Sequence, residues 1–133
     1  MIEINNLTAY SIDKGILKKI SAEILKKESS SKGDLSIALV GQKRIKELNK
    51  RYRRKDRPTD VLSFEDKENI GEIVICPVEV KKNARKFKTS FKKELNKVLI
   101  HGILHLLGYD HESGPKKAKT MEQKQEYYLA NIK

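Results

Sequence analysis

The chain has 133 residues, and its 29 Lys and Arg against 18 Asp and Glu give a formal net charge of +11 at pH 7. This length suits one domain over residues 1–133 with a core of its own, and the charge suits a polyanionic partner such as nucleic acid. One cysteine excludes an intrachain disulfide framework, and we find neither a secretory signal pattern nor an apolar run near the ~20 residues that span a membrane, so we expect a soluble cytoplasmic protein.

The first third of the chain predicts two strands around a helix. Apolar and polar residues alternate over residues 1–5, as in a half-buried strand. A helix capped by Ser11 or Asp13 follows, and its apolar face comprises Ile16, Leu17, Ile20, Ile24 and Leu25. After the turn-rich segment SSSKGD, the apolar run 35–40 predicts a buried strand.

The middle of the chain predicts a second helix and a hairpin. The helix begins after Gly41 and ends before Pro58, and its apolar side comprises Ile45, Leu48 and Tyr52. Residues 59–64 and 71–76 have the composition of strands, and the polar residues EDKEN between them favour an antiparallel hairpin.

Three helices complete the predicted fold. Pro77 suits the first turn of a short basic helix. Thr89 or Ser90 caps a long helix, whose apolar positions are Phe91, Leu95, Val98, Leu99, Leu106 and Leu107. A last helix follows the segment SGPKK and carries Met121, Tyr128 and Leu129. The order β-α-β-α-β-β-α-α-α predicts an α+β fold, a single domain with a mixed four-stranded sheet packed by about five helices.

All three histidines fall within HGILHLLGYDH, residues 101–111. His101 and His105 are four residues apart, so on a helix both imidazoles can reach one ion. Gly108 can take the left-handed conformation that ends a helix, which lets the chain return His111 towards the other two. Three nitrogen ligands with an open fourth position are typical of catalytic zinc. We therefore predict one Zn²⁺ per chain, held by His101, His105 and His111 on a zincin-like helix.

The histidine spacing also matches metzincin proteases, in which a glutamate follows the first histidine as the general base. In this chain that residue is Gly102. A zinc peptidase is therefore an alternative that the missing carboxylate opposes. Packing histidines are a further alternative, which this spacing opposes.

A basic stretch precedes the histidines in the segment NKRYRRKDRPTDVLSF, residues 49–64. Six of its first nine residues are Lys or Arg, and Tyr52 places an aromatic ring among them. Arginine presents a fixed fork of donors that fits a phosphate. The stretch alone is equally consistent with a solvated helix end, where cations are also favoured.

Together, the motifs N..YR.KD.PTDVLSF and HG.LHLLGYDH, with GEIVI between them, resemble the YbeY family, bacterial endoribonucleases of ribosomal RNA maturation. The resemblance extends over essentially the whole chain. It implies zinc at the three histidines and cleavage of single-stranded RNA in ribosomal RNA processing, notably at the 3′ end of the small-subunit RNA, and in ribosome quality control. The implied partners are ribosomal RNA and the ribosome, with no membrane and no DNA.

The family's functionally important arginine falls by motif position on Arg53. The predicted catalytic residues are therefore Arg53, His101 and His105, and the predicted RNA-binding residues are Arg53, Arg54, Lys55 and Arg57. A zinc ion can polarise a phosphate oxygen and lower the pKa of bound water, while an arginine steadies the developing negative charge. Direct hydrolysis and attack by the RNA 2′-OH are both open.

Four further residues carry weaker predictions. Asp110 is either an acceptor for a ligand imidazole, in the second shell of the metal, or a turn residue. Glu112 is a candidate for proton transfer, Tyr109 is expected to pack, and Cys76 is expected to be a small buried hydrophobe rather than a ligand. A non-enzymatic RNA-binding factor of ribosome assembly, with a structural zinc, is the alternative function from a different class.

Overall fold

The computed structural model describes residues 1–30, 33–110 and 112–132. Within these ranges the elements follow the predicted order, so the α+β fold with a mixed four-stranded sheet and five helices is confirmed. The elements are β1 (Ile2–Asn6), α1 (Lys14–Lys27), β2 (Leu35–Leu39), α2 (Gln42–Arg53), β3 (Val61–Phe64), β4 (Gly71–Ile75), α3 (Pro77–Lys86), α4 (Phe91–Leu106) and α5 (Pro115–Ala130). No described helix has both the length and the apolar character needed to cross a membrane.

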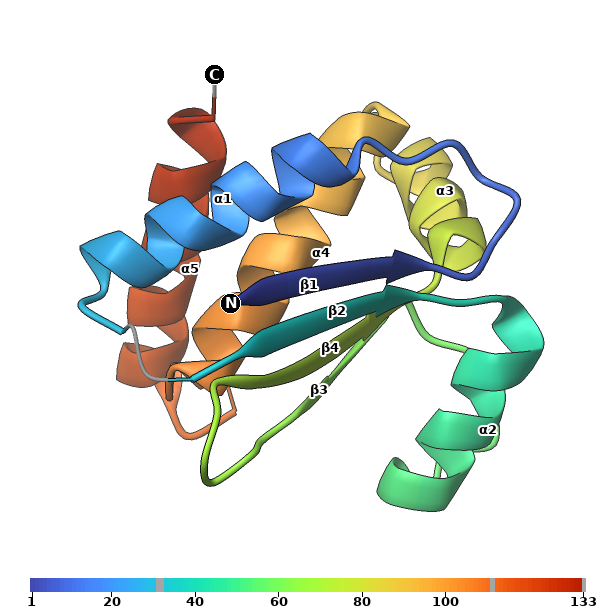
Figure 1. Ribbon diagram of the computed structural model, residues 1–133, viewed down its shortest axis with the longest axis horizontal. Coiled ribbons are helices and arrows are strands. Elements are labelled where there is room, and N and C mark those ends of the chain that lie inside the picture. Colours follow the sequence, from blue (N-terminus) through green and yellow to red (C-terminus); the bar gives the residue numbers. More distant parts are fainter. Residues whose placement is uncertain (31–32, 111, 133) are drawn as a thin grey trace.

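The sheet has the order β1-β2-β4-β3. The strands β1, β2 and β4 are parallel, and β3 lies antiparallel to β4 at the edge, which confirms the predicted hairpin. Parallel strands need covered faces, and helices lie on both sides of this sheet (Figure 1). The helices α1, α3, α4 and α5 are on one side, and α2 is on the other.

Two apolar clusters follow from this arrangement. Side chains alternate between the faces of a strand, so Ile37 and Ile73 point towards α1 and α4, while Val74 points towards α2. The larger cluster joins α1, α4 and α5 to the sheet, whereas the smaller one comprises Val40, Ile45, Leu62, Val74 and Cys76. The buried Cys76 is the small hydrophobe that its sequence context predicts.

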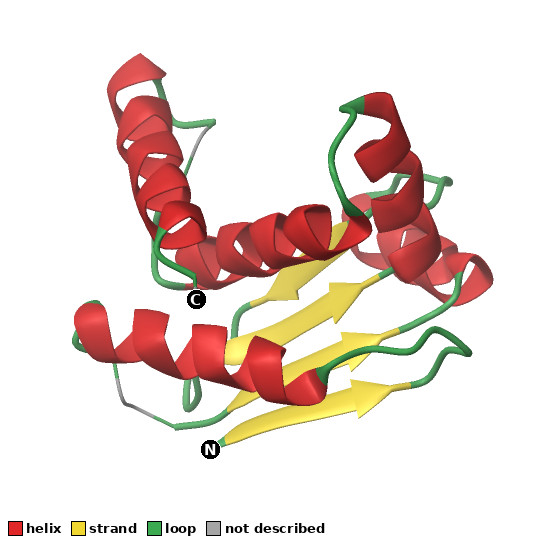
Figure 2. Ribbon diagram, turned by 90° about the horizontal axis from the view of Figure 1, so that it is seen from above, coloured by secondary structure: helices red, strands yellow, loops and turns green. Residues whose placement is uncertain are grey.

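The long helix α4 runs between α1, α3 and α5 and across the sheet (Figure 2). Of the two predicted caps, Ser90 is the one used, and its hydroxyl accepts a hydrogen bond from the backbone N–H of Lys93 at 3.1 Å. Nearly every residue of α4 from Glu94 to Leu104 is buried, and Lys97 and His101 are the two that are not. The position of α4 is therefore set by packing along most of its length.

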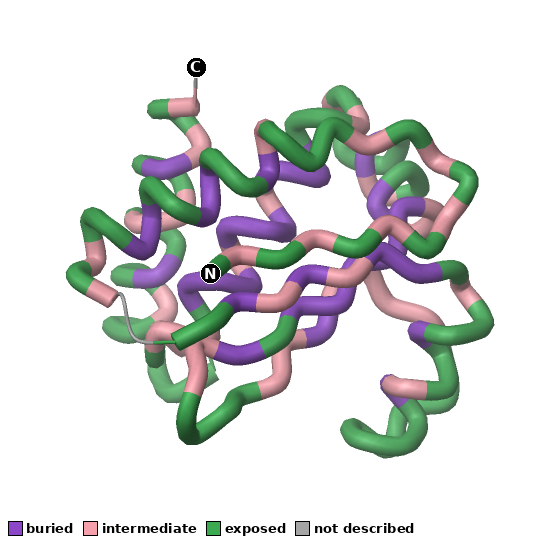
Figure 3. Tube along the Cα trace, viewed as in Figure 1, coloured by how far each residue is buried: buried purple, intermediate pink, exposed green. Residues whose placement is uncertain are grey.

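The prediction for α2 was wrong in one respect. Ile45 is fully buried, but Tyr52 is 57% exposed and does not continue the apolar side into the core. Its ring instead meets Phe64 of β3 edge-on, with the ring centroids 5.2 Å apart. The helix is short and most of its surface is in water, as its exposed trace shows (Figure 3), so the Tyr52 ring of its last turn lies against β3 and not in the core.

Candidate functional site

A cleft of about 670 Å³ lies between the end of α2, the edge strand β3 and the carboxyl half of α4. Two segments that are fifty residues apart in sequence meet there, because α4 crosses the sheet above β3 while α2 leads into β3 from the other side. The residues that line the cleft are Tyr52, Arg53, Val61, Leu62, Ser63, Phe64, Glu65, His101, His105 and Glu112. Three predicted site residues, Arg53, His101 and His105, therefore share one hollow.

The imidazole of His101 is oriented by the last helix. Its Nδ1 lies 2.9 Å from the side-chain oxygen Oε1 of Gln125 on α5. An amide oxygen only accepts hydrogen bonds, so Nδ1 carries the proton and Nε2 keeps the lone pair in the neutral ring. Metal-binding histidines are commonly held in one tautomer by such a partner. In this tautomer, the nitrogen of His101 that could coordinate a metal would be Nε2.

The turn after α4 has the geometry that the glycine predicts. Gly108 has φ +100°, and the backbone N–H groups of Gly108 and Tyr109 donate to the carbonyls of His105 and Leu104 at 3.1 and 3.0 Å. This pair of bonds is the Schellman motif, which reverses the chain at a helix end. His111 lies outside the described residues. Among the residues described, no group of three histidines, cysteines or carboxylates forms a metal site.

Asp110 organises the loop beyond this turn. Its Oδ1 accepts a hydrogen bond from the backbone N–H of Glu112 at 2.7 Å, and its Oδ2 accepts one from the hydroxyl of Ser113. Asp110 therefore serves as a turn residue, one of the two roles expected for it. Its other predicted role, as an acceptor for a ligand imidazole, stays a prediction.

The same turn is tied to the first helix through Glu28. The Tyr109 hydroxyl donates to Glu28 Oε1 at 2.6 Å, and the Tyr128 hydroxyl and Lys124 Nζ of α5 donate to Oε2, the latter at 3.1 Å. Burial alone raises the pKa of the Glu28 carboxyl, but these three hydrogen bonds outweigh it and hold the pKa below its usual range. The hydrogen bond to Glu28 also raises the pKa of Tyr109. Tyr109 therefore packs, as expected, and also links the turn after α4 to Glu28 at the end of α1.

The packing of α4 against the sheet explains why residue 102 is a glycine. Its Cα faces the sheet, and an added Cβ would lie 3.2 Å from Cγ2 of Ile73 and 3.3 Å from Oγ of Ser63. The Ser63 hydroxyl donates to the Gly102 carbonyl at 3.3 Å across this contact. Glycine thus suits the close approach of α4 to the sheet, and a longer side chain at this position would be directed at Ile73 and Ser63.

Arg53 occupies the last residue of α2, where the chain turns sharply. The next residue, Arg54, has the left-handed backbone conformation, with φ +57°. The buried Asn49 holds the following loop, because its amide donates to the Arg57 carbonyl at 2.9 Å and its backbone carbonyl accepts from the Lys55 N–H at 3.3 Å. These contacts direct Arg53 into the cleft from a helix end that is otherwise exposed.

The other predicted RNA-binding residues lie near the cleft but do not line it. Arg54, Lys55 and Arg57 are exposed in the loop between α2 and β3. Asp60 fixes the entry of β3, since its Oδ2 accepts a hydrogen bond from Asn83 of α3 at 3.2 Å. Glu112 does line the cleft, as expected of a proton-transfer candidate.

Sequence reasoning missed two kinds of site residue. Gln125 was not singled out, because a glutamine in an amphipathic helix carries no signal for a histidine 24 positions earlier. Ser63, Phe64 and Glu65 of the cleft lie in the segment DVLSFE, where none of these three was given a role. Strand alternation could have shown which of these residues share a face of the sheet, but it does not say which helix covers that face.

Comparisons with known proteins agree with this arrangement. A family model described as "Endoribonuclease YbeY" matches residues 3–133. Proteins named endoribonuclease YbeY include one from Thermotoga maritima, 48% identical over 87% of this chain and 78% of that protein. Another, from Persephonella marina, is 39% identical over 92% of this chain and 86% of that protein. A solution structure of a Thermotoga maritima protein superposes with a TM-score of 0.73 at 43% identity, covering 99% of this chain and 89% of that one.

Proposed function

The chain belongs to the YbeY endoribonuclease family, and from this premise we propose that it is a zinc-dependent enzyme that cuts single-stranded RNA in the cleft between α2, β3 and α4. The observation that carries the proposal is the meeting of Arg53 with His101 and His105 in one hollow. Arg53 suits a phosphate and the two histidines suit a metal, and the proposed mode of RNA cleavage uses both. Ribosomal RNA processing, including the small-subunit 3′ end, is the proposed cellular task.

The donor set suits zinc. Imidazole nitrogens are good zinc ligands, and His101 is already held in the tautomer that presents Nε2. His105 lies one turn further along the same helix face, and His111 is the proposed third ligand. Zinc, when bound, lowers the pKa of coordinated water and polarises a phosphate oxygen.

Arg53 has the role of binding the phosphate that is cleaved. Its guanidinium is charged at all relevant pH values and offers paired donors to two phosphate oxygens. Negative charge grows on these oxygens as the bond breaks, so a positioned cation stabilises the transition state more than the ground state. Glu65 and Glu112 are the carboxylates among the described residues that line the cleft, and they are available for proton transfer.

The alternative activities are less well supported. The relatives bear the name of an endoribonuclease, not of a peptidase, and the position of the peptidase glutamate is occupied by Gly102, where an added side chain would press against Ile73 and Ser63. A purely structural zinc would need no arginine in the same cleft. We also propose that the protein acts in the cytoplasm with the ribosome as its partner, since ribosomal RNA is the proposed substrate.

The proposal is tested by removing and restoring the metal. Chelated protein should lose cleavage of single-stranded RNA, and one equivalent of Zn²⁺ should restore it, as expected for about one ion per three-histidine site. His105→Ala should show neither zinc binding nor cleavage, while Lys14→Ala, on the exposed side of α1, should retain both. Equal cleavage by chelated and zinc-loaded protein would refute the proposal.

A further inference from the structure

The positive charge of the chain is concentrated in two segments. Residues 43–57 contain nine basic and two acidic side chains, and residues 79–97 contain eight basic and two acidic ones. The rest of the chain has two more acids than bases. The first segment is α2 and the loop that follows, and it supplies Arg53 to the cleft. The second segment comprises α3 and the first half of α4, and the proposed cleavage chemistry uses none of its charges.

The second segment is connected to the metal ligands through α4. Beyond its first two residues and apart from its last residue, Leu106, the side chains that α4 leaves accessible follow an i, i+4 spacing: Lys93, Lys97, His101 and His105. Residues four apart lie on the same side of a helix, about 6 Å apart along its axis. One accessible line therefore runs from the two proposed zinc ligands to two lysines.

An aromatic ring stands beside these lysines. Phe87, at the end of α3, is 55% exposed. The Nζ atoms of Lys97 and Lys86 lie 5.4 and 5.7 Å from its ring centroid. Large exposed apolar rings flanked by cations are typical of surfaces on which nucleic acid bases stack while the lysines meet the phosphates.

The cations of this segment are available for a ligand. Among the described residues, only Lys82 has a carboxylate within ion-pair distance, Glu79 at 3.2 Å. The hollow beside Lys93 and Lys97 also contains carboxylates, but Glu94 is only 3% exposed, and Glu122 and Glu126 belong to the α5 wall. The carboxylates of Glu122 and Glu126, which repel RNA phosphates, thus lie on the α5 side of the lysines, whereas Phe87 lies at the end of α3.

From these observations we propose that Lys93, Lys97 and Phe87 form a second RNA subsite that continues the substrate strand from the metal centre along α4. The proposal rests on the proposed function. The strand leaves the cleft at His101, passes the Gln125 side chain, and follows the lysines with its phosphates. One unpaired base stacks on Phe87. The two hollows meet at the His101–Gln125 hydrogen bond, since Gln125 lines the second one.

The test compares two paired charge deletions. Lys93→Gln/Lys97→Gln removes the proposed contacts, and Lys14→Gln/Lys18→Gln removes an exposed i, i+4 pair from α1. Zinc-loaded proteins bind a labelled single-stranded RNA of about 12 nucleotides, and stopped-flow anisotropy records binding before turnover. The Lys93/Lys97 variant should reduce the slope of log K against log salt by about 1.4, because each lost phosphate contact contributes about 0.7. The α1 pair should leave the slope unchanged.

The aromatic contact has its own controls. Phe87→Leu should weaken RNA binding at least about fivefold, because a base loses its stacking partner, and Phe87→Tyr should bind as the wild type does. Equal effects of the two lysine pairs, or equal binding by Phe87→Leu and Phe87→Tyr, would overturn the subsite. Loss of affinity for an acidic protein, with RNA binding intact, would assign the surface to a protein partner instead. Wild-type protein that binds RNA with the expected slopes but never cuts it would support this surface and refute the proposed activity.

Discussion

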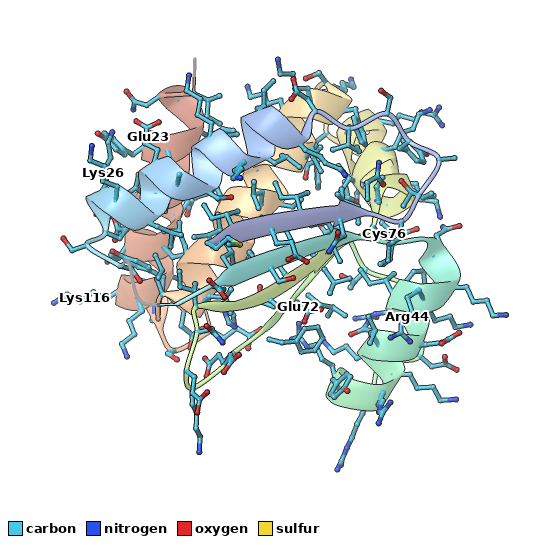
Figure 4. All side chains as sticks on the ribbon, viewed as in Figure 1. Glu23, Lys26, Arg44, Glu72, Cys76 and Lys116 are labelled. Carbon is cyan, nitrogen blue, oxygen red and sulfur yellow. The ribbon has the colours of Figure 1, made fainter. Side chains whose placement is uncertain are left out.

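The two halves of the cleft are built in different ways. His101 and His105 project from α4, a helix that is buried on nearly every side. Arg53 projects from the end of α2, where only Ile45 and Asn49 are buried and charged side chains such as Arg44 reach into water (Figure 4). Metal ligands must converge on one point, which a packed helix provides, whereas a phosphate-binding arginine can adjust to its ligand. Mutations that disturb packing should therefore weaken metal binding by His101 and His105 before they weaken phosphate binding by Arg53.

The largest effect is expected from Gly102→Glu. The new side chain has to displace Ile73 and Ser63 or bury its charge against the sheet, and a buried unpaired carboxylate costs at least about 3 kcal/mol. Urea unfolding should show this loss, together with reduced zinc binding and no peptidase activity. Gly102→Ala is the matched control, since its single methyl needs a shift of only a few tenths of an ångström. A Gly102→Glu protein as stable as the wild type would contradict the tight packing of α4.

The next largest effect is expected at Gln125. Replacing Gln125 by Leu keeps the approximate size but removes the acceptor for His101 Nδ1. Losses of this kind typically reduce metal affinity by about 10- to 100-fold. Competition with a zinc chelator measures the change. Gln123→Leu, on the same helix, should leave the zinc affinity unaltered. Unchanged affinity in Gln125→Leu would show that α5 does not orient the ligand.

A smaller effect, limited to substrate binding by the Arg53 side of the cleft, is expected from Asn49→Ala. The carbonyl of the exposed Arg57 loses the hydrogen bond from the buried Asn49, which costs about 0.5–1.5 kcal/mol, and the loop after Arg53 loses its anchor. RNA cleavage should fall through weaker substrate binding, while zinc content stays at the wild-type level. Zinc loss in this variant would mean that the two halves are not built independently.

The smallest effect concerns the pH dependence of stability. The pKa of Glu28 is lower in the folded protein than in the unfolded chain. The ionised carboxylate therefore adds to the free energy of unfolding in full above the ordinary glutamate pKa, and this stabilisation is lost as the pH falls through the lower pKa of the folded protein. The wild type should thus lose more stability than Glu28→Gln between neutral pH and the acid range. Thermal unfolding at several pH values measures this, and parallel curves for the two proteins would contradict it.

Local signals in the sequence sufficed for most of the fold. Asp13 caps α1 and Gly108 ends α4 because these residues act on their own neighbours. Tyr52 was assigned to the apolar side of its helix, because periodicity shows which side of a helix is apolar but not how far a partner surface extends. The sequence placed Arg53 with the histidines through a family resemblance, and the cleft brings them together. Gln125 and the reason for Gly102 depend on how α5 and β4 dock against α4, which no local pattern encodes.

The most direct test of the two-part site is cleavage by Arg53→Ala, with the zinc content measured in the same sample. The account predicts about one zinc per chain and single-turnover cleavage about 100- to 1,000-fold slower than wild type, the usual loss for a positioned charge that acts on the transition state. Arg44→Ala, which removes one charge from the exposed side of the same helix, should cleave normally. Wild-type cleavage by Arg53→Ala, with zinc bound, would contradict the central claim.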